Sequence, residues 1–118
     1  FFMNPVVATT AHASLMDTMK TAVPAFPAGE GLVKIPAAWL IEHAGFARGF
    51  GDGPVALSSK HPLAITNRGG AMARDVVALA TRIKRQVADR FGVALRTEPI
   101  FVGFGDDQDV AYLNSAAL

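Results

Sequence analysis

Apolar side chains recur every three or four residues between positions 71 and 91, which is the spacing of one face of an α-helix. This stripe consists of Val76, Leu79, Ile83, Val87 and Phe91. Charged side chains fill the positions around it: Arg74, Arg82, Lys84, Arg85, Asp89 and Arg90. The pattern predicts one long amphipathic helix that lies on a sheet and turns a solvated basic face outward.

The segment after this helix carries one acidic side chain between two apolar runs. Gly92 suits the end of a helix because glycine adopts positive φ without strain, and residues 93–95 then predict a strand. Glu98 follows that strand and precedes a further apolar run at 100–102. From spacing alone, this carboxylate is either a surface turn residue or an acid placed for chemistry.

The first part of the chain alternates between extended and helical patterns. Residues 1–8 predict a short strand that Asn4-Pro5 interrupts, because proline cannot donate to a strand ladder. A helix is expected next, from an N-cap at Thr10 to about Val23.

Proline and glycine divide the following stretch. Residues 24–31 predict a loop, and 32–35 predict a short strand. Pro36 suits the first turn of a second helix, since its missing N–H costs nothing there, and Gly45 ends that helix. The inward side of this helix consists of Ala37, Leu40, Ile41 and Ala44.

Two more strands are predicted at 55–57 and 63–65, joined by a polar connection. Residues 104–118 show weak patterning, and we expect a tail that packs loosely or pairs locally. Together these elements predict an α+β fold, with a small mixed or antiparallel sheet covered by two or three helices. We expect one domain over 1–103, followed by the tail over 104–118.

Composition narrows the classes of function. The 118 residues are 51% hydrophobic and 18% charged, as in a compact globular domain. A net charge of +1 gives no sign of a nucleic-acid partner, and no apolar run is long enough for a membrane helix. The absence of cysteine excludes disulfides and thiolate sites and fits a reducing compartment, so we expect a cytoplasmic protein.

The motifs of common active sites are missing. The three histidines, His12, His43 and His61, lack the spacing of metal ligands, so we expect no metal site. No glycine-rich phosphate loop joins a strand to a helix, and no serine lies in a nucleophile elbow. The residues alone therefore leave the purpose of the domain open.

Several separate sequence blocks, in order and at matching spacing, resemble the C-terminal substrate-binding domain of UDP-N-acetylenolpyruvoylglucosamine reductase, also called UDP-N-acetylmuramate dehydrogenase. The resemblance covers 1–103 but not the tail. The blocks are Phe1-Phe2-Met3-Asn4-Pro5-Val6-Val7, Lys34-Ile35-Pro36-Ala37-Ala38-Trp39-Leu40-Ile41-Glu42, Ser59-Lys60-His61, Asn67-Arg68-Gly69-Gly70, Phe91-Gly92-Val93 and Glu98-Pro99.

The resemblance implies a reaction of peptidoglycan synthesis, in which NADPH and FAD reduce the enolpyruvyl group of a UDP-sugar. Hydride addition to the vinyl carbon leaves an enolate-like centre that must be protonated, so an acid is required there. By position, Glu98 matches the glutamate that stands at this carbon in the family, together with a serine that precedes the two phenylalanines. Partial burial would raise the pKa of such an acid. The pair Arg96-Thr97 departs from the proline that the family more often has beside the glutamate.

The resemblance also implies substrate-binding residues. Asn4 matches an asparagine that helps to bind the nucleotide diphosphate, and Lys60 and His61 match a segment that reaches the UDP moiety. FAD and NADPH are expected to be bound mainly by an upstream part of the same protein, because the chain starts at Phe1 like a piece of something longer. The isolated fragment is then expected to be inactive.

A second hypothesis keeps the fold without the chemistry. The chain could serve as a non-catalytic α+β module that binds a small molecule or a partner protein. In that case Glu98 and Asn4 are ordinary turn residues, and the loop at 58–62 is simply polar. A flavin-binding region upstream of Phe1 would favour the enzyme over this module.

Overall fold

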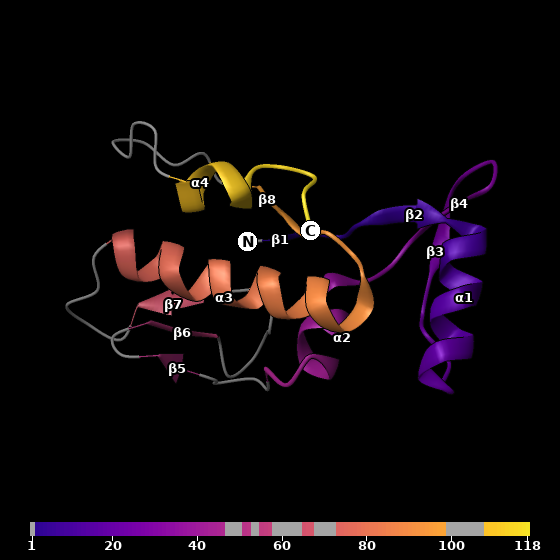
Figure 1. The fold of residues 1–118 in the computed structure, drawn as a ribbon, viewed down its shortest axis with the longest axis horizontal. Coiled ribbons are helices and arrows are strands. Elements are labelled where there is room, and N and C mark those ends of the chain that lie inside the picture. Colours follow the sequence, from indigo (N-terminus) through magenta and orange to yellow (C-terminus); the bar gives the residue numbers. More distant parts are fainter. Residues whose placement is uncertain (1, 47–50, 53–54, 58–64, 68–72, 99–107) are drawn as a thin grey trace.

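The computed structural model describes residues 2–46, 51–52, 55–57, 65–67, 73–98 and 108–118. Figure 1 shows a long central helix with small sheets and shorter helices around it. The helices are α1 (Thr9–Met19), α2 (Ala37–His43), α3 (Ala73–Phe91) and α4 (Gln108–Leu113). The strands are β1 (Phe2–Met3), β2 (Val6–Ala8), β3 (Phe26–Gly29), β4 (Leu32–Lys34), β5 (Gly51–Asp52), β6 (Val55–Leu57), β7 (Ile65–Asn67) and β8 (Arg96–Thr97).

The α+β class predicted from the sequence is confirmed, but the described strands form three small sheets rather than one. Their orders are β1-β8, β2-β4-β3 and β5-β6-β7, and every pairing is antiparallel. The predicted break at Asn4-Pro5 explains the division at the N-terminus, because it separates β1 from β2. The first strand pairs with β8 near the end of the chain, whereas the second pairs with β4.

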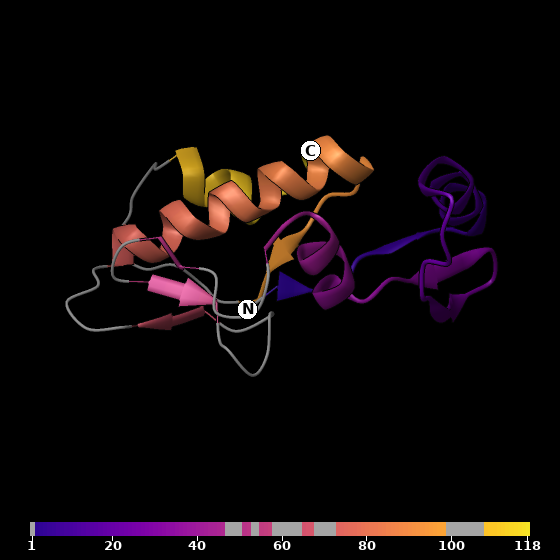
Figure 2. The same ribbon diagram turned by 90° about the horizontal axis from the view of Figure 1, so that it is seen from below.

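The apolar stripe of α3 forms the centre of the core, as predicted. Leu79, Ile83 and Val87 are fully buried, and the helix contacts α2, α4 and β6. In Figure 2, α3 runs along the upper face of the molecule, with β6 and β7 below it and α4 next to it. Gly92 has a φ of +67°, so the residue expected to end this helix does so in the left-handed region.

The basic face of α3 is not uniformly solvated. Lys84 is fully buried, which contradicts the expectation of a purely exposed basic face. The reason lies in α4, which packs against this side of α3 and buries Val110 and Leu113. The prediction of a loosely packed tail is therefore wrong for α4, whereas residues 116–118 are exposed.

The chain after α3 enters its sheet later than predicted. Residues 93–95 are not a strand, although Val93 and Leu95 are buried. The ladder forms only where the chain meets the two residues of β1, so Phe2 pairs with Thr97 and Met3 with Arg96. Glu98 still follows the strand directly, as expected.

The helix predicted over 10–23 is the shorter α1. Ala8 takes the N-cap position and forms no side-chain cap bond, so the expected threonine cap is wrong. The N–H of Thr9 donates instead to the carbonyl of Gly31, with the N and O atoms 3.0 Å apart. Lys20 ends the helix with a φ of +58°.

The predicted loop over 24–31 contains the edge strand β3. Pro27 is tolerated there because an edge strand needs fewer ladder donors, and the pairing with β4 is irregular between Pro27 and Gly29. The strand predicted at 63–65 appears as β7, at Ile65–Asn67, paired with β6. The first two residues of that prediction lie outside the described part of the chain.

Candidate functional site

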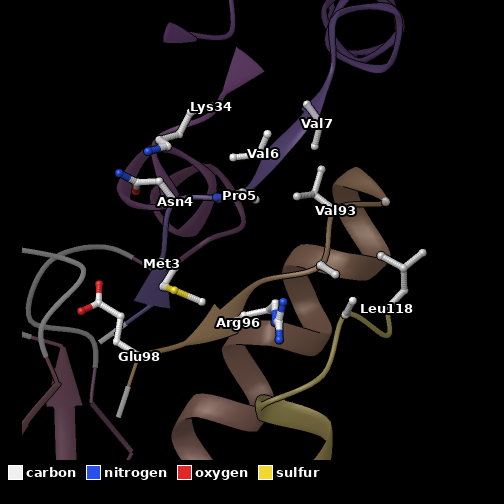
Figure 3. A pocket seen from close by; sticks show the side chains of 13 residues that line it. Met3, Asn4, Pro5, Val6, Val7, Lys34, Val93, Arg96, Glu98 and Leu118 are labelled. Carbon is white, nitrogen blue, oxygen red and sulfur yellow. The ribbon is translucent and has the colours of Figure 1, made fainter. Parts of the chain in front are cut away.

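A pocket of about 870 Å³ opens where the N-terminal segment meets the end of α3 and β8. Figure 3 shows Lys34, Asn4 and Glu98 toward one side of this pocket and Val7, Val93 and Leu118 toward the other, with Arg96 between them. The lining residues are Met3, Asn4, Pro5, Val6, Val7, Lys34, Gly92, Val93, Ala94, Arg96, Glu98, Ala116 and Leu118. Two of the residues predicted from the sequence, the asparagine and the glutamate, therefore lie at one site.

The antiparallel β1-β8 pair brings two segments from opposite ends of the chain to this pocket, and the two residues lie beyond opposite ends of the short ladder. Asn4 follows the end of β1, and Glu98 follows the end of β8. Because Phe2 pairs with Thr97, the N-terminal end of β1 points toward Glu98. The Asn-Pro break then carries the chain along the pocket into β2.

Asn4 has a structural bond as well as a place in the pocket. Its Oδ1 accepts a hydrogen bond from the N–H of Ala37, with the two atoms 2.8 Å apart. Pro36 occupies the N-cap position of α2 and has no side-chain acceptor, so Asn4 caps this helix from a distant part of the chain. The Nδ2 amide group is the part of the side chain that remains to donate to a ligand.

Glu98 lies in the pocket with an exposed side chain. The described residues leave this carboxylate open to solvent. They do hold its backbone in place, because the preceding Thr97 is buried and paired with Phe2.

Two cationic side chains line the same pocket, and neither was predicted from the sequence to bind a ligand. Lys34 ends β4 and is exposed, opposite Val6 in the sheet. Arg96 lies in β8, and its Nη2 donates to the carbonyl of Asn114 at 3.4 Å. The signal for Lys34 was present, since it opens one of the blocks that carry the resemblance.

The other two predicted binding residues, Lys60 and His61, lie outside the described residues. Two histidines are described, and each contacts the backbone. His12 Nε2 lies 2.7 Å from the carbonyl oxygen of Val23, and His43 Nδ1 lies 2.8 Å from that of Trp39. The rings of His43 and Trp39 are stacked, with centroids 3.9 Å apart.

The described part of the chain limits other kinds of site. It contains no group of three or more histidine, aspartate or glutamate side chains that could hold a metal ion. Among these residues, no helix is both long and apolar enough to cross a membrane. The polar groups that line the pocket are one carboxylate (Glu98), one amide (Asn4) and two cations (Lys34 and Arg96), and its other lining side chains are apolar.

The sequence matches a known family over most of its length. The family model described as "UDP-N-acetylenolpyruvoylglucosamine reductase, C-terminal domain" matches residues 1–102. The reductase of Thermobifida fusca is 45% identical over 109 residues, and that of Mycobacterium sp. (strain MCS) is 49% identical over 105 residues. Each alignment covers 87% of this chain, but only 31% and 30% of the relatives' own lengths.

A reductase of Corynebacterium diphtheriae shows the same relation, with 49% identity over 107 residues and coverage of 87% of this chain and 28% of that protein. The chain thus spans about a third of the length of the curated relatives it matches. The chain belongs to the UDP-N-acetylenolpyruvoylglucosamine reductase family, in which it matches the C-terminal domain.

Proposed function

We propose that this chain is the substrate-binding part of an FAD- and NADPH-dependent reductase that converts UDP-N-acetylglucosamine enolpyruvate to UDP-N-acetylmuramate for peptidoglycan. The observation that carries the proposal is the meeting of Asn4, Lys34 and Glu98 at one pocket, in a chain of this family. An anionic diphosphate needs cations and N–H donors, and a reacting enolate needs an acid. The pocket offers both kinds of group.

Lys34 and Asn4 are suited to the diphosphate. An ammonium group is a strong point charge for phosphate oxygens, and Nδ2 of Asn4 adds a directed donor. The hydrogen bond from Ala37 to Oδ1 of Asn4 fixes the orientation of the amide, so the Nδ2 group is held ready before the ligand arrives. We keep Lys60 and His61 as further candidates for the UDP moiety.

Glu98 is the proposed acid at the reacting carbon. After a hydride adds to the vinyl carbon, the adjacent centre becomes enolate-like, and a positioned acid protonates it. The direction of β1 supports a partner for this acid. Since Phe2 lies opposite Thr97 in an antiparallel pair, the chain that leads into β1 comes from the direction of Glu98. We propose that the residue before the two phenylalanines in the parent protein is a second group near this acid. The family has a serine there.

We do not expect the described residues to form a flavin site of their own, since they contain no glycine-rich turn that leads from a strand into a helix and could cradle a diphosphate. We therefore place FAD and NADPH mainly in the remainder of the parent protein, which would also cover the exposed Glu98. The flavin supplies the hydride, and the residues of this chain bind the UDP-sugar and handle the proton. A cytoplasmic location and roles in cell shape and division follow from this proposal.

NADPH oxidation by the full-length protein tests the proposal, with UDP-N-acetylglucosamine enolpyruvate as acceptor and with flavin absorbance followed in parallel. We expect oxidation that depends on the acceptor and a bound flavin. The 118-residue chain alone should neither bind FAD nor oxidise NADPH. A full-length protein without flavin and without acceptor-dependent oxidation would identify the chain as a non-catalytic module, and UDP-sugar binding would then remain as its function.

A further inference from the structure

Residues 108–118, here called the C-terminal arm, form one unit that the proposed chemistry does not use. The arm comprises α4 and the five residues after it, and it lies beyond the part matched by the family model. Two apolar side chains, Val110 and Leu113, are buried against the core. The arm is therefore packed against the rest of the fold through α4.

Lys84 of α3 holds the arm at the end of α4. Its Nζ donates to the carbonyl oxygen of Tyr112 and, at 2.8 Å, to that of Ser115. The same ammonium group lies 4.3 Å from the centre of the Tyr112 ring. The Tyr112 carbonyl lies in the last turn of α4 and the Ser115 carbonyl just beyond it, at the end of a helix where a cation is favoured. The buried lysine thus fixes where the arm leaves α4.

The arm also binds the strand that leads to Glu98. Thr97 Oγ1 donates to Oδ1 of Asn114 at 2.9 Å, and Arg96 donates to the carbonyl of Asn114. Thr97 is buried and immediately precedes Glu98. The end of the arm is therefore joined by side-chain hydrogen bonds to both residues of β8.

Beyond these contacts the arm reaches the pocket. Ala116 and Leu118 line it, and Leu118 is 63% exposed, so its side chain is largely unburied. Figure 3 shows Leu118 on the same side of the pocket as Val93 and Val7, away from Glu98 and Lys34. The arm adds an apolar surface to the side of the pocket away from Glu98 and Lys34, with Arg96 between the two sides.

We propose that the C-terminal arm is a wall of the nucleotide site, with Leu118 as a contact for the uridine and Lys84 as the residue that positions the arm. This role rests on the proposed function, which sets the order of the ligand's parts along the pocket. A UDP-sugar that places its reacting end at Glu98 and its diphosphate at Lys34 extends its uncharged uridine toward the aliphatic side. Leu118 becomes buried when that part of the ligand arrives.

Two ligands separate this wall from the phosphate site. UDP carries the uridine, whereas inorganic pyrophosphate carries only the charges, and both can be titrated into the 118-residue chain by calorimetry or NMR. Leu118→Ala should weaken UDP binding about three- to tenfold and change pyrophosphate binding less than twofold. Leu118→Met should restore UDP binding to within about twofold, because it returns apolar volume. Lys84→Met should reproduce the selective loss, since it releases the arm.

Controls make the outcome decisive. Arg74→Met removes an exposed basic side chain of the same helix and should change neither affinity. Leu118 is mostly exposed, so its replacement tests the contact without disturbing the core. In the full-length reductase, Leu118→Ala should raise KM for the UDP-sugar and leave kcat unchanged, as expected for binding that is equal in ground and transition states.

Several results would overturn the inference. One is UDP affinity within twofold of wild type in both Leu118→Ala and Lys84→Met, and another is an equal loss of UDP and pyrophosphate affinity. Failure of the proposed function looks different, because the chain would then show arm-dependent UDP selectivity while the full-length protein fails to oxidise NADPH with the acceptor. A wild-type chain that binds no UDP would overturn both.

Discussion

The two walls of the pocket are built in different ways. The N-terminal wall runs from Asn4 through β2 to Lys34, and its strands belong to a three-stranded sheet. The C-terminal wall carries Glu98 directly after β8, a strand of two residues with one described partner strand. The second wall therefore relies on side-chain contacts with the C-terminal arm, whereas the first is held by backbone pairing.

Each wall also depends on one side chain that satisfies a helix end from a distance. Asn4 accepts from the first N–H of α2, and Lys84 donates to carbonyls at the end of α4. The first cap is neutral and easily solvated. The second is a buried cation, which costs free energy to place. The wall with the proposed acid is therefore the conditional one: its position depends on a cation that must stay buried, and burying that cation costs free energy.

The largest expected effect falls on the acid itself. Glu98→Gln in the full-length reductase should lower kcat by roughly a thousandfold, the scale on which positioned acids act, since the amide cannot give a proton. Reduction of the flavin by NADPH should stay near the wild-type rate, because that half-reaction does not need this proton. Stopped-flow absorbance separates the two steps. A steady-state rate equal to wild type would remove Glu98 from the mechanism.

Asn4 tests the first wall, because its two side-chain atoms have separate roles. Asn4→Asp keeps an oxygen for the N–H of Ala37 but replaces the Nδ2 donor with negative charge. We expect stability near wild type and UDP affinity lowered about tenfold or more. Asn4→Ala loses both atoms and should also lower the free energy of unfolding by about 1 kcal/mol. Urea denaturation and UDP titration of both variants provide the comparison.

The result for Asn4→Asp decides which role matters more. Equal UDP affinity in Asn4→Asp and wild type would leave Asn4 as a structural cap alone. Loss of stability in Asn4→Asp would show that the bond to Ala37 depends on the neutral amide. Either outcome would change the account of the N-terminal wall without affecting the C-terminal one.

Sequence reasoning recovered the parts of the fold that depend on local pattern. The stripe of α3 and the break at Asn4-Pro5 follow from periodicity and from the chemistry of proline, and both are present in the structure. The family resemblance, which the match over 1–102 supports, singled out Asn4 and Glu98 for the site. Their meeting depends on the β1-β8 pair, whose two strands are too short to show a pattern of their own.

The C-terminal wall could not be predicted for a physical reason. Lys84 sits among basic residues on a helix, and nothing in that run marks the one side chain that a distant helix will cover. The arm itself shows only Val110 and Leu113 as inward positions, which is too few for a recognisable period. Its docking is a tertiary event that overrides the local pattern.

Removing the buried cation tests the support of the second wall directly. In Lys84→Met, the carbonyls of Tyr112 and Ser115 lose the bonds from the ammonium group, and the Tyr112 carbonyl keeps only its local bonds from Ser115. We expect α4 to open more often, since so short a helix depends on its tertiary contacts. Amide hydrogen exchange in 108–115 should become about tenfold faster, while exchange in the central turns of α3 stays near wild type. The exposed Arg74→Met serves as the matched variant. Unchanged protection of α4 in Lys84→Met would mean that Val110 and Leu113 hold the arm unaided.

The last expected effect is a pH dependence of stability that comes from the same lysine. Burial, with a further contribution from the nearby Arg96 charge, lowers the pKa of Lys84 from 10.5 to about 8. The unfolded chain therefore binds more protons than the folded one between these two values, and the free energy of unfolding should rise as pH increases from about 8 to 10.5. The slope for one proton is at most about 1.4 kcal/mol per pH unit. The neutral amine still donates to the two carbonyls.

The difference in the free energy of unfolding between wild type and Lys84→Met isolates the contribution of the lysine, because the other titrating groups nearby are present in both proteins. Tyr112 is the group that must be separated most carefully. Burial raises its pKa above 10.0, with Arg85 opposing and Asp89 adding to the shift, so its ionisation favours unfolding at the upper end of the range. Urea midpoints measured from pH 7 to 10 should show the wild type gaining stability relative to Lys84→Met. A constant difference would mean that the arm leaves the lysine accessible to water, and the second wall would then be no more conditional than the first.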